Sequence, residues 1–253
     1  MIQSGRLTAF LNQFLCTKDF IESAINGLQV QGKKKVSKVA FAVDGVLASF
    51  QEASNWGADY LIVHHGLFWG RPYPLRGADY RRFKCLLDHE MALYAVHLPL
   101  DAHLEVGHAA CLLKSLGVEG GCEPFGRYDD RFIGAMGTIS EVTREQFISS
   151  IQSLFPEPVR TLTFGRDKIK KVACVTGQGA DFNYLKEAQI KNIDFYISGE
   201  TSHPSFHYCQ EQAMNLALCG HYQTETFGLK ALMEHIKANF EVEVKFFDLP
   251  TGF

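Results

Sequence analysis

The order of apolar and polar positions along the chain predicts alternating strands and helices. Short runs of apolar, often β-branched residues are typical of buried strands, and they occur at positions 39–43, 60–63 and 92–96. Longer stretches with helical spacing follow them at positions 46–56, 80–89 and 103–116. We expect an α/β fold built on parallel strands, because strands that alternate with helices are typical of such sheets.

The second half of the chain repeats the first. Three pairs of segments correspond: Val36–Val43 with Ile169–Thr176, Asp59–Ile62 with Asp194–Ile197, and Leu93–Val96 with Leu216–Cys219. The period is too long for a solenoid, so we infer a duplicated, two-lobed α/β protomer whose halves are related by a pseudo-two-fold axis. The glycine- and proline-rich stretch 120–126 predicts lobes at 1–125 and 126–253, and it stays open whether the C-terminal segment packs back on the first lobe.

The strand predicted at 60–63 runs directly into His64, His65 and Gly66. The chemistry of α/β folds usually lies at the carboxyl ends of strands, and neutral imidazole is the commonest metal ligand in proteins. Adjacent strand residues point to opposite faces, however, so one buried and one exposed histidine is an equally good interpretation. The pair alone leaves both interpretations open.

Two later strand-end loops each carry an imidazole and a carboxylate four residues apart, His97 with Asp101 and His221 with Glu225. The two loops are equivalent in the repeat, in which the His64–His65 pair aligns with Gly199–Glu200. On a helix, side chains at this spacing can face one point. The candidate metal ligands are therefore His64, His65, Asp101, His221 and Glu225.

Three imidazoles and two carboxylates without a thiolate suit zinc, manganese, iron or nickel. Five ligands are too many for one catalytic zinc ion and predict two divalent ions per chain. The two carboxylates offset only part of the charge of two such ions, so we expect an anionic small-molecule substrate. His97 and Glu200, the repeat equivalents of ligands, are candidate catalytic residues that support the ligands or transfer a proton.

Composition narrows the class of protein. The 253 residues carry a formal net charge of -3, which gives no basic footprint for nucleic acid. No apolar run approaches the ~20 residues of a membrane span, and Met1–Phe14 predicts an amphipathic helix and not a signal peptide. The seven cysteines show no Cys-x-x-Cys spacing, which favours reduced thiols in a cytoplasmic protein.

Other histidines have more ordinary interpretations. His203 and His207 have i, i+4 spacing, but Pro204 predicts a helix start with both side chains partly exposed. His103 and His108 lie on a predicted helix, where we expect them to line a cleft and not to bind metal.

Two loops and one short stretch are further candidates. Thr176–Gly179 follows a strand, but it lacks the P-loop lysine and predicts a tight turn. Phe68, Trp69 and Tyr73 follow the histidine pair and predict either a base-binding wall or a subunit contact. Asn26–Val30 offers no titratable group and predicts a turn near the cleft.

Five short motifs carry a resemblance that covers essentially the whole chain. They are Asn26-Gly27-Leu28-Gln29-Val30, Val63-His64-His65-Gly66, His97-Leu98-Pro99-Leu100-Asp101, Ser198-Gly199-Glu200 and Gly220-His221-Tyr222-x-Thr224-Glu225. In this order and spacing the chain resembles the GTP cyclohydrolase 1 type 2 homologue family, also called NGG-interacting factor three-like proteins. The resemblance implies a two-lobed α/β protomer with mixed sheets, assembled as a toroidal homohexamer, a trimer of dimers.

The resemblance also implies dinuclear metal sites facing an internal cavity. The family's ligands carry over to the five candidate residues, with Glu225 bridging the ions. The family name implies hydrolytic opening of the guanine ring of GTP, so we expect a metal-dependent hydrolase acting on a nucleotide or another phosphorylated metabolite. The alternative is a non-catalytic metal-binding hexamer with a regulatory or metal-trafficking role.

Overall fold

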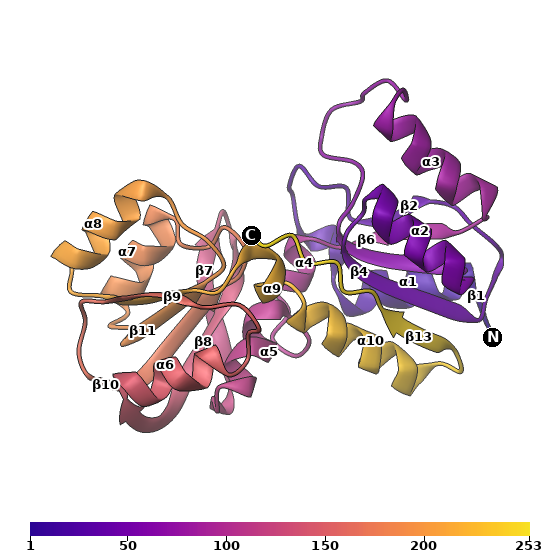
Figure 1. The fold of residues 1–253 in the computed structure, drawn as a ribbon. Coiled ribbons are helices and arrows are strands. Elements are labelled where there is room, and N and C mark those ends of the chain that lie inside the picture. The colour runs from indigo at the N-terminus through magenta and orange to yellow at the C-terminus, as the bar shows by residue number, and fades with distance from the viewer. The chain divides into compact units, whose positions relative to one another are not determined.

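The computed structural model describes residues 1–253 and divides into two compact units. The first unit comprises Met1–Leu100 and Leu229–Leu249, and the second comprises Asp101–Gly228 and Pro250–Phe253. Each unit has its own mixed β-sheet with helices packed against it (Figure 1). The predicted α/β class with mixed sheets is therefore confirmed.

The sheet of the first unit has the strand order β13-β4-β5-β6-β2. Its strands are β2 (Gly27–Val30), β4 (Lys38–Asp44), β5 (Tyr60–His65), β6 (Ala92–Ala95) and β13 (Glu243–Phe246). Strands β13, β4, β5 and β6 run parallel, and β2 pairs antiparallel with β6. The prediction of a turn at Asn26–Val30 was wrong for residues 27–30, because these residues complete the ladder at the edge beside β6. A separate ladder joins β1 (Ile2–Gln3) to β3 (Lys35–Val36).

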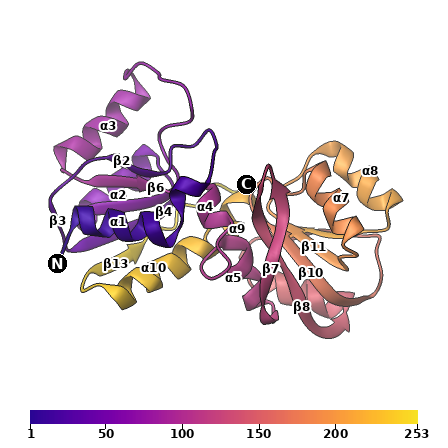
Figure 2. The same cartoon turned by 180° about the vertical axis from the view of Figure 1, so that it is seen from behind.

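Helices cover both faces of this sheet. They are α1 (Ser4–Phe14), α2 (Leu47–Trp56), α3 (Ala78–Asp88) and α10 (Phe227–Asn239), with a 3-10 turn η1 (Thr17–Asp19). Phe50 of α2 is buried in an apolar cluster with side chains of α3 and the sheet. On the other face, Thr8 Oγ1 of α1 lies 2.9 Å from the hydroxyl of Tyr60, and Phe14 stacks on His235 of α10 with centroids 4.1 Å apart. Figures 1 and 2 show α2 and α1 from these opposite sides.

The sheet of the second unit has the strand order β7-β8-β10-β11-β12-β9. Its strands are β7 (Glu119–Tyr128), β8 (Arg131–Thr143), β9 (Arg160–Thr163), β10 (Lys168–Val175), β11 (Phe195–Ser198) and β12 (Asn215–Leu218). Only β10, β11 and β12 run parallel. The helices are α5 (His108–Ser115), α6 (Arg144–Gln152), α7 (Phe182–Ile190) and α8 (His203–Glu211), with α6 and the α7–α8 pair on opposite faces in Figure 1. Two short helices, α4 (Leu98–Asp101) and α9 (His221–Thr224), follow β6 and β12.

The observed boundary between the units differs from the predicted one. Gly120, Gly121 and Gly126 have positive φ angles of 72°, 94° and 74°, but they lie within β7, which pairs with β8. These glycines make the ladder irregular and do not end it, as the register shift between Glu119 and Glu123 shows. The segment Leu229–Leu249 belongs to the first unit, where β13 extends the sheet beside β4.

The internal repeat is visible in equivalent hydrogen bonds of the two units. Asp59 Oδ2 accepts hydrogen bonds from the backbone N–H groups of Ser37–Lys38 at 2.8 and 3.2 Å. Asp194 Oδ2 accepts the corresponding bonds from Lys170–Lys171 at 3.0 and 2.8 Å. Each aspartate precedes the second parallel strand and holds the start of the first, so β4-β5-β6 and β10-β11-β12 are the same substructure.

The cysteines and the helices agree with the compositional expectations. All seven cysteines are free thiols, and burial raises the pKa of Cys209 to about 11 and that of Cys219 to about 12. Thiols of this kind are mostly protonated near neutral pH and make poor metal ligands. None of the helices combines the length and apolar character that a membrane crossing requires.

Candidate metal site

In the first unit, three imidazole rings converge at the carboxyl ends of β5 and β6. The ring centroids of His64 and His65 lie 4.7 Å apart, and that of His97 lies 5.0 Å from His64 and 5.7 Å from His65. One ring nitrogen from each lies within 4.8 Å of the others, which is close enough to hold an ion. His64 is buried and His65 is half-buried, so the rings of the pair belong to one cluster although they are adjacent in sequence. Both histidines lie in β5, and His65 is its last residue, so the two rings are presented at the carboxyl end of the strand.

Hydrogen bonds at Nδ1 fix the tautomer of both rings of the pair. His64 Nδ1 lies 2.9 Å from the carbonyl oxygen of Val96, and because a carbonyl can only accept, Nδ1 carries the proton. His65 Nδ1 donates in the same way to Asp44 Oδ1 at 2.8 Å. With the proton on Nδ1, the nitrogen that would bind an ion is Nε2, which is the usual arrangement of a metal-binding histidine with a supporting acceptor.

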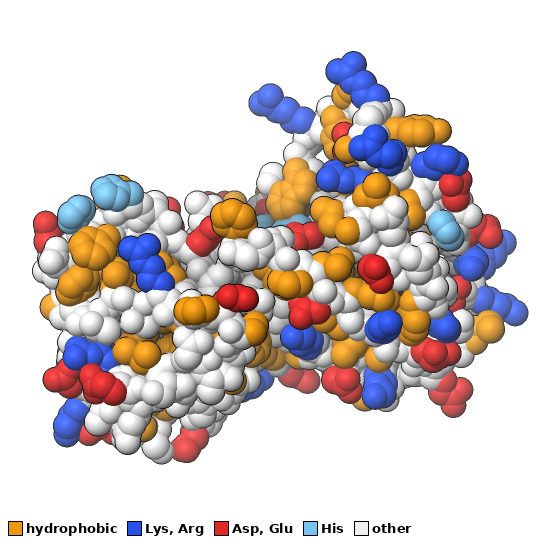
Figure 3. All heavy atoms as spheres, in the orientation of Figure 1, with side chains coloured by type: hydrophobic (Ala, Val, Ile, Leu, Met, Phe, Trp, Pro, Cys, Tyr) orange, Lys and Arg blue, Asp and Glu red, His pale blue; other side chains and the backbone are white.

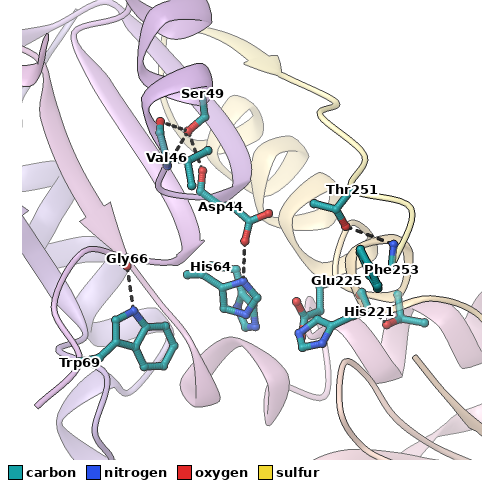
Figure 4. A network of polar contacts seen from close by, with 12 residues as sticks. Asp44, Val46, Ser49, His64, Gly66, Trp69, His221, Glu225, Thr251 and Phe253 are labelled. Atoms are coloured by element: carbon teal, nitrogen blue, oxygen red, sulfur yellow. Dashed lines mark hydrogen bonds and ion pairs between the residues drawn. The ribbon is translucent and has the colours of Figure 1, made fainter. Parts of the chain in front are cut away.

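The Asp44 carboxylate is held at the end of β4 by its own neighbours. The hydroxyl of Ser49 donates to the backbone carbonyl of Asp44 at 2.6 Å, and the N–H of Gly45 donates to the carbonyl of His65 at 2.7 Å. Figure 4 shows the Asp44 carboxylate directed to an imidazole nitrogen and the Ser49 hydroxyl behind it. The support of His65 is therefore rigid, since both ends of the contact are fixed by backbone hydrogen bonds.

His97 has a second carboxylate on its ring. Glu22 Oε2 accepts from His97 Nδ1 at 2.5 Å, while Glu22 Oε1 accepts from Asn26 Nδ2 at 2.7 Å and from the N–H of Leu98 at 3.1 Å. Asn26 Oδ1 in turn accepts from the N–H of His97 at 2.8 Å. Burial raises the pKa of Glu22, but the hydrogen bond and charge of His97, with Asn26 and Leu98, outweigh it and lower the pKa. Glu22 is thus a buried carboxylate that orients His97.

In the second unit, His221 and Glu225 form the equivalent pair at the start and end of α9. His221 Nε2 lies 3.2 Å from Glu225 Oε1, and His221 Nδ1 lies 2.7 Å from Glu200 Oε1. The hydrogen bond to Glu225 raises the pKa of His221, and the charges of both glutamates raise it further. Burial has the opposite effect but is outweighed, and the pKa of His221 is raised to about 9. In the metal-free protein a proton therefore lies where the imidazole and the carboxylate meet, and a divalent ion fits the same pair of donors.

Glycines bring the backbone of the second unit against these donors. Gly177 has φ 57°, and a Cβ there would meet Glu225 Oε1 and lie 3.0 Å from His221 Nε2. A Cβ at Gly199 would lie 2.6 Å from the carbonyl of Gly177 and 2.8 Å from the Cα of His221. The N–H of Gly177 donates to Thr224 Oγ1 at 3.0 Å. The segment 176–179 is therefore a tight turn packed on the donors, as the sequence predicted.

Asp101 closes α4 and belongs to the second unit. Its side chain is buried and accepts a hydrogen bond from the hydroxyl of Thr176 at 3.2 Å. This contact brings Asp101 to the turn that also approaches Glu225 and His221 within the same unit. The second unit therefore has two buried carboxylates that could bind metal, Asp101 and Glu225.

The remaining histidines are used in other ways. His108 is buried, and its Nδ1 accepts a hydrogen bond from the N–H of Gly228 at 3.0 Å, the reverse of the role that Nδ1 has in His64. His103 Nδ1 accepts from backbone N–H groups of the following turn. His203 and His207 are exposed on α8, which confirms the prediction from Pro204 at the helix start. The pale blue side chains over α8 in Figure 3 show this exposure.

The profile of the Duf34/NIF3 family (NGG1p interacting factor 3) matches residues 2–251. The chain belongs to this family. It is 40% identical over 253 residues to a protein named GTP cyclohydrolase 1 type 2 homolog from Pyrococcus abyssi, covering 99% of this chain and 100% of the relative. A relative of the same name from Archaeoglobus fulgidus is 40% identical over 248 residues, covering 98% of each. The resemblance that the five motifs predicted is confirmed.

Two solved structures have the same fold over essentially the whole chain. TTHA1606 from Thermus thermophilus aligns with a TM-score of 0.91 at 37% identity and full coverage of both chains. Reduced HcgD from Methanocaldococcus jannaschii aligns with a TM-score of 0.86 at 25% identity, covering 98% of each chain. The mixed α/β fold of this chain is therefore that of its family.

Sequence reasoning missed two of the groups that support the donors. Asp44 directly follows a predicted strand, and an acidic residue at that end of an α/β strand was a usable signal. Glu22 lies in an irregular segment between α1 and β2, with no pattern that links it to His97. Asn26 was expected only to shape a turn, whereas its amide holds both Glu22 and the backbone of His97.

Proposed function

We propose that this Duf34/NIF3 protein is a dinuclear metal-dependent hydrolase whose ions are bound by His64, His65, Asp101, His221 and Glu225. The observation that carries the proposal is the common state of the three histidines. In each of them Nδ1 is held by a carbonyl or carboxylate of the protein, so an ion would be bound through Nε2, which in His221 already lies 3.2 Å from the second proposed ligand Glu225. Oriented imidazoles at strand ends, together with the buried carboxylates of Asp101 and Glu225, favour metal binding over ordinary packing.

The chemistry of the donors fits zinc, manganese, iron or nickel, because imidazole nitrogen and carboxylate oxygen are present and thiolate is absent. A bound pair of such ions supplies Lewis acidity and activates water for hydrolysis near neutral pH. The buried carboxylates of Asp101 and Glu225 would offset part of the ionic charge. The remaining positive charge favours an anionic substrate such as a nucleotide or another phosphorylated metabolite.

Two further residues receive distinct roles in this proposal. His97 has Nδ1 occupied by Glu22, so its Nε2 can exchange a proton with the substrate. Glu200 accepts the Nδ1 proton of His221 and acts through that ring, which makes it a positioning residue. The sequence assigned both residues either role, and the hydrogen bonds favour one role for each.

The experiment that tests the proposal is a hydrolysis screen. Protein stripped of metal and then loaded separately with zinc, manganese, iron or nickel is incubated with pools of nucleotides, GTP included, and of other phosphorylated metabolites. We expect metal-dependent loss of at least one compound, and loss of this activity in His64→Ala and Glu225→Ala. The matched control is His203→Ala, which removes an exposed histidine of α8 and should leave the turnover unchanged.

Bound metal without turnover on any pool would reject the hydrolase and favour a regulatory or metal-trafficking role. Assembly is tested separately, by light scattering of the purified protein. We propose a homohexamer, a trimer of dimers, and a monomer at micromolar concentration would reject that part alone.

A further inference from the structure

The first unit exposes the indole ring of Trp69 beside its donor histidines. The Trp69 ring centroid lies 6.0 Å from that of His65 and 5.1 Å from that of His97, the latter in an edge-on arrangement. The side chain nevertheless keeps 42% of its surface exposed. Large aromatic side chains are usually well covered, so an exposed indole next to candidate ligands calls for a function.

The neighbouring aromatic rings of the same loop are used in packing. Phe68 packs against Phe83 of α3 with ring centroids 5.7 Å apart and against Tyr73 at 6.2 Å. The hydroxyl of Tyr73 donates to the carbonyl of Leu67 at 2.8 Å, and both rings are half-buried. Of the three aromatic residues that suggested a base-binding wall or a subunit contact, Trp69 is therefore the one whose ring is open to a ligand.

The indole is held in place before any ligand arrives. Its Nε1–H donates to the carbonyl of Gly66 at 3.0 Å, a bond that Figure 4 shows beside the strand end carrying His64. The backbone of Trp69 pairs with Ala24, next to the segment that supplies Glu22 and Asn26 to His97. A ring fixed in this way loses little conformational entropy on binding, which favours stacking.

Exposed basic residues follow Trp69 in the same loop. Gly70 has φ 78°, and the N–H of Arg71 donates to the carbonyl of Trp69 at 2.9 Å, so a three-residue turn connects Trp69 to Arg71. Arg71 and Arg76 are exposed, as are two basic side chains of α3. Figure 3 shows Lys and Arg side chains gathered over α3 and the loop before it, although the chain as a whole has a net charge of -3.

We propose that Trp69 and Arg71 form a specificity element that binds a nucleotide, with the base stacked on the indole and a phosphate on the guanidinium. This inference rests on the proposed function, since it places the reacting part of that nucleotide at the neighbouring histidines. The indole would recognise a planar aromatic base, and the guanidinium would recognise an anion. Stacking of a base on an aromatic side chain is worth about 1–3 kcal/mol, which corresponds to roughly tenfold or more in affinity.

The test measures binding and not turnover, using zinc-loaded protein with GMP, guanosine and ribose 5-phosphate as probes in equilibrium dialysis. We expect Trp69→Ala to weaken GMP binding at least about tenfold and to leave ribose 5-phosphate binding unchanged. Trp69→Phe, which keeps an aromatic face, should stay within about threefold of the wild type. Arg71→Gln should weaken GMP and ribose 5-phosphate alike and leave guanosine unchanged.

A fluorescence titration gives an independent reading, because the chain has two tryptophans. Trp56 ends α2 and packs on Phe247 with centroids 6.1 Å apart, so Trp56→Phe leaves Trp69 as the reporter without changing the loop. GMP should quench this variant and ribose 5-phosphate should not.

Three results would overturn the inference. They are equal loss of GMP and ribose 5-phosphate binding in Trp69→Ala, unchanged GMP affinity in that variant, and absence of saturable GMP binding by the wild type. Each of them leaves metal-dependent turnover in the hydrolysis screen untouched, so failure here is distinguishable from failure of the proposed hydrolase.

Discussion

The two units use one substructure to present different side chains at the same place. In the first unit the second parallel strand, β5, ends in His64 and His65, whereas its equivalent β11 is followed by Gly199 and Glu200. At Gly199 a Cβ would collide with the backbone of Gly177 and with the Cα of His221, so no histidine fits there. The first unit therefore takes its donors from the strand itself, and the second takes them from the helix after the next strand.

The duplicated scaffold therefore fixes the positions of the strand ends but not the chemistry at each end. Where the strand of the first unit offers an imidazole, His65, the strand of the second offers the carboxylate Glu200, which supports an imidazole. The equivalent histidines His97 and His221 are each held by a glutamate at Nδ1, but Glu22 is 3% exposed and Glu200 is 42% exposed. In both units a glutamate therefore supports the equivalent histidine, but Glu200 is open to water and Glu22 is not.

The largest effect is expected at the glycine that packs on the donors of the second unit. Gly177→Ala forces a Cβ against Glu225 and His221 at a positive φ, so we expect loss of metal binding and a destabilisation of about 2 kcal/mol or more. Metal analysis and thermal unfolding check the two effects. Gly120→Ala is the matched control, because Gly120 also has a positive φ of 72° but open space around it. Retained metal binding in Gly177→Ala would contradict the close approach.

Asp59 and Asp194 occupy equivalent positions in the two units, so their replacement should destabilise the protein equally. Asp59→Ala and Asp194→Ala each remove a carboxylate that accepts two backbone N–H groups, and we expect each to lower the free energy of unfolding by about 2–3 kcal/mol. Denaturant titration measures both. A difference above about 1 kcal/mol would mean that the repeat is equivalent in shape and not in energetics.

Smaller effects are expected for Glu200 and Glu22, the first on metal affinity and the second on turnover. Glu200→Gln weakens the orientation of the proposed ligand His221, so metal affinity should fall about tenfold. Glu22→Gln acts on His97, so turnover should fall about tenfold or more while the metal content is unchanged. Metal titration and steady-state kinetics on both variants check this division. Parallel changes in metal affinity would instead make His97 a ligand.

The smallest effect concerns pH in the metal-free protein. The pKa of His221 is raised from 6.5 to about 9, so its protonated form stabilises the fold fully below about pH 6.5 and the contribution is lost as pH rises toward 9. Allowing for solvent screening of a partly exposed ring, we expect a loss of about 1 kcal/mol, or a fall of about 2–4 °C in Tm. Thermal unfolding from about pH 6 to 9 measures this loss. The slope should vanish in His221→Gln, and an unchanged slope there would assign the effect to other groups.

The sequence was a good guide to the elements whose pattern is continuous. The apolar runs before His64 and His97 predicted β5 and β6, and equivalent runs in the second half revealed the repeat. Gly120 to Gly126 misled, because glycines that make a strand irregular have the same composition as a linker. The five candidate ligands could be named from strand-end positions and motifs, since ligation requires particular side chains.

The supporting groups were harder to predict than the ligands. Glu22 reaches His97 across 75 positions of sequence, and no local pattern records a contact of that separation. The role of Trp69 depends on how much of its ring stays exposed beside His65, which only the packing of Phe68 and Tyr73 decides. The histidine tautomers likewise depend on hydrogen bonds to residues that are distant in sequence, which the hydrophobic periodicity does not reveal.

The central claim is that His64, His65, Asp101, His221 and Glu225 bind two divalent ions, and calorimetric titration of metal-free protein with zinc tests it most directly. We predict two ions per chain for the wild type and for His203→Ala. His64→Ala and Glu225→Ala should each bind fewer than two. One ion or none in the wild type, or two ions retained in both ligand variants, would contradict the claim.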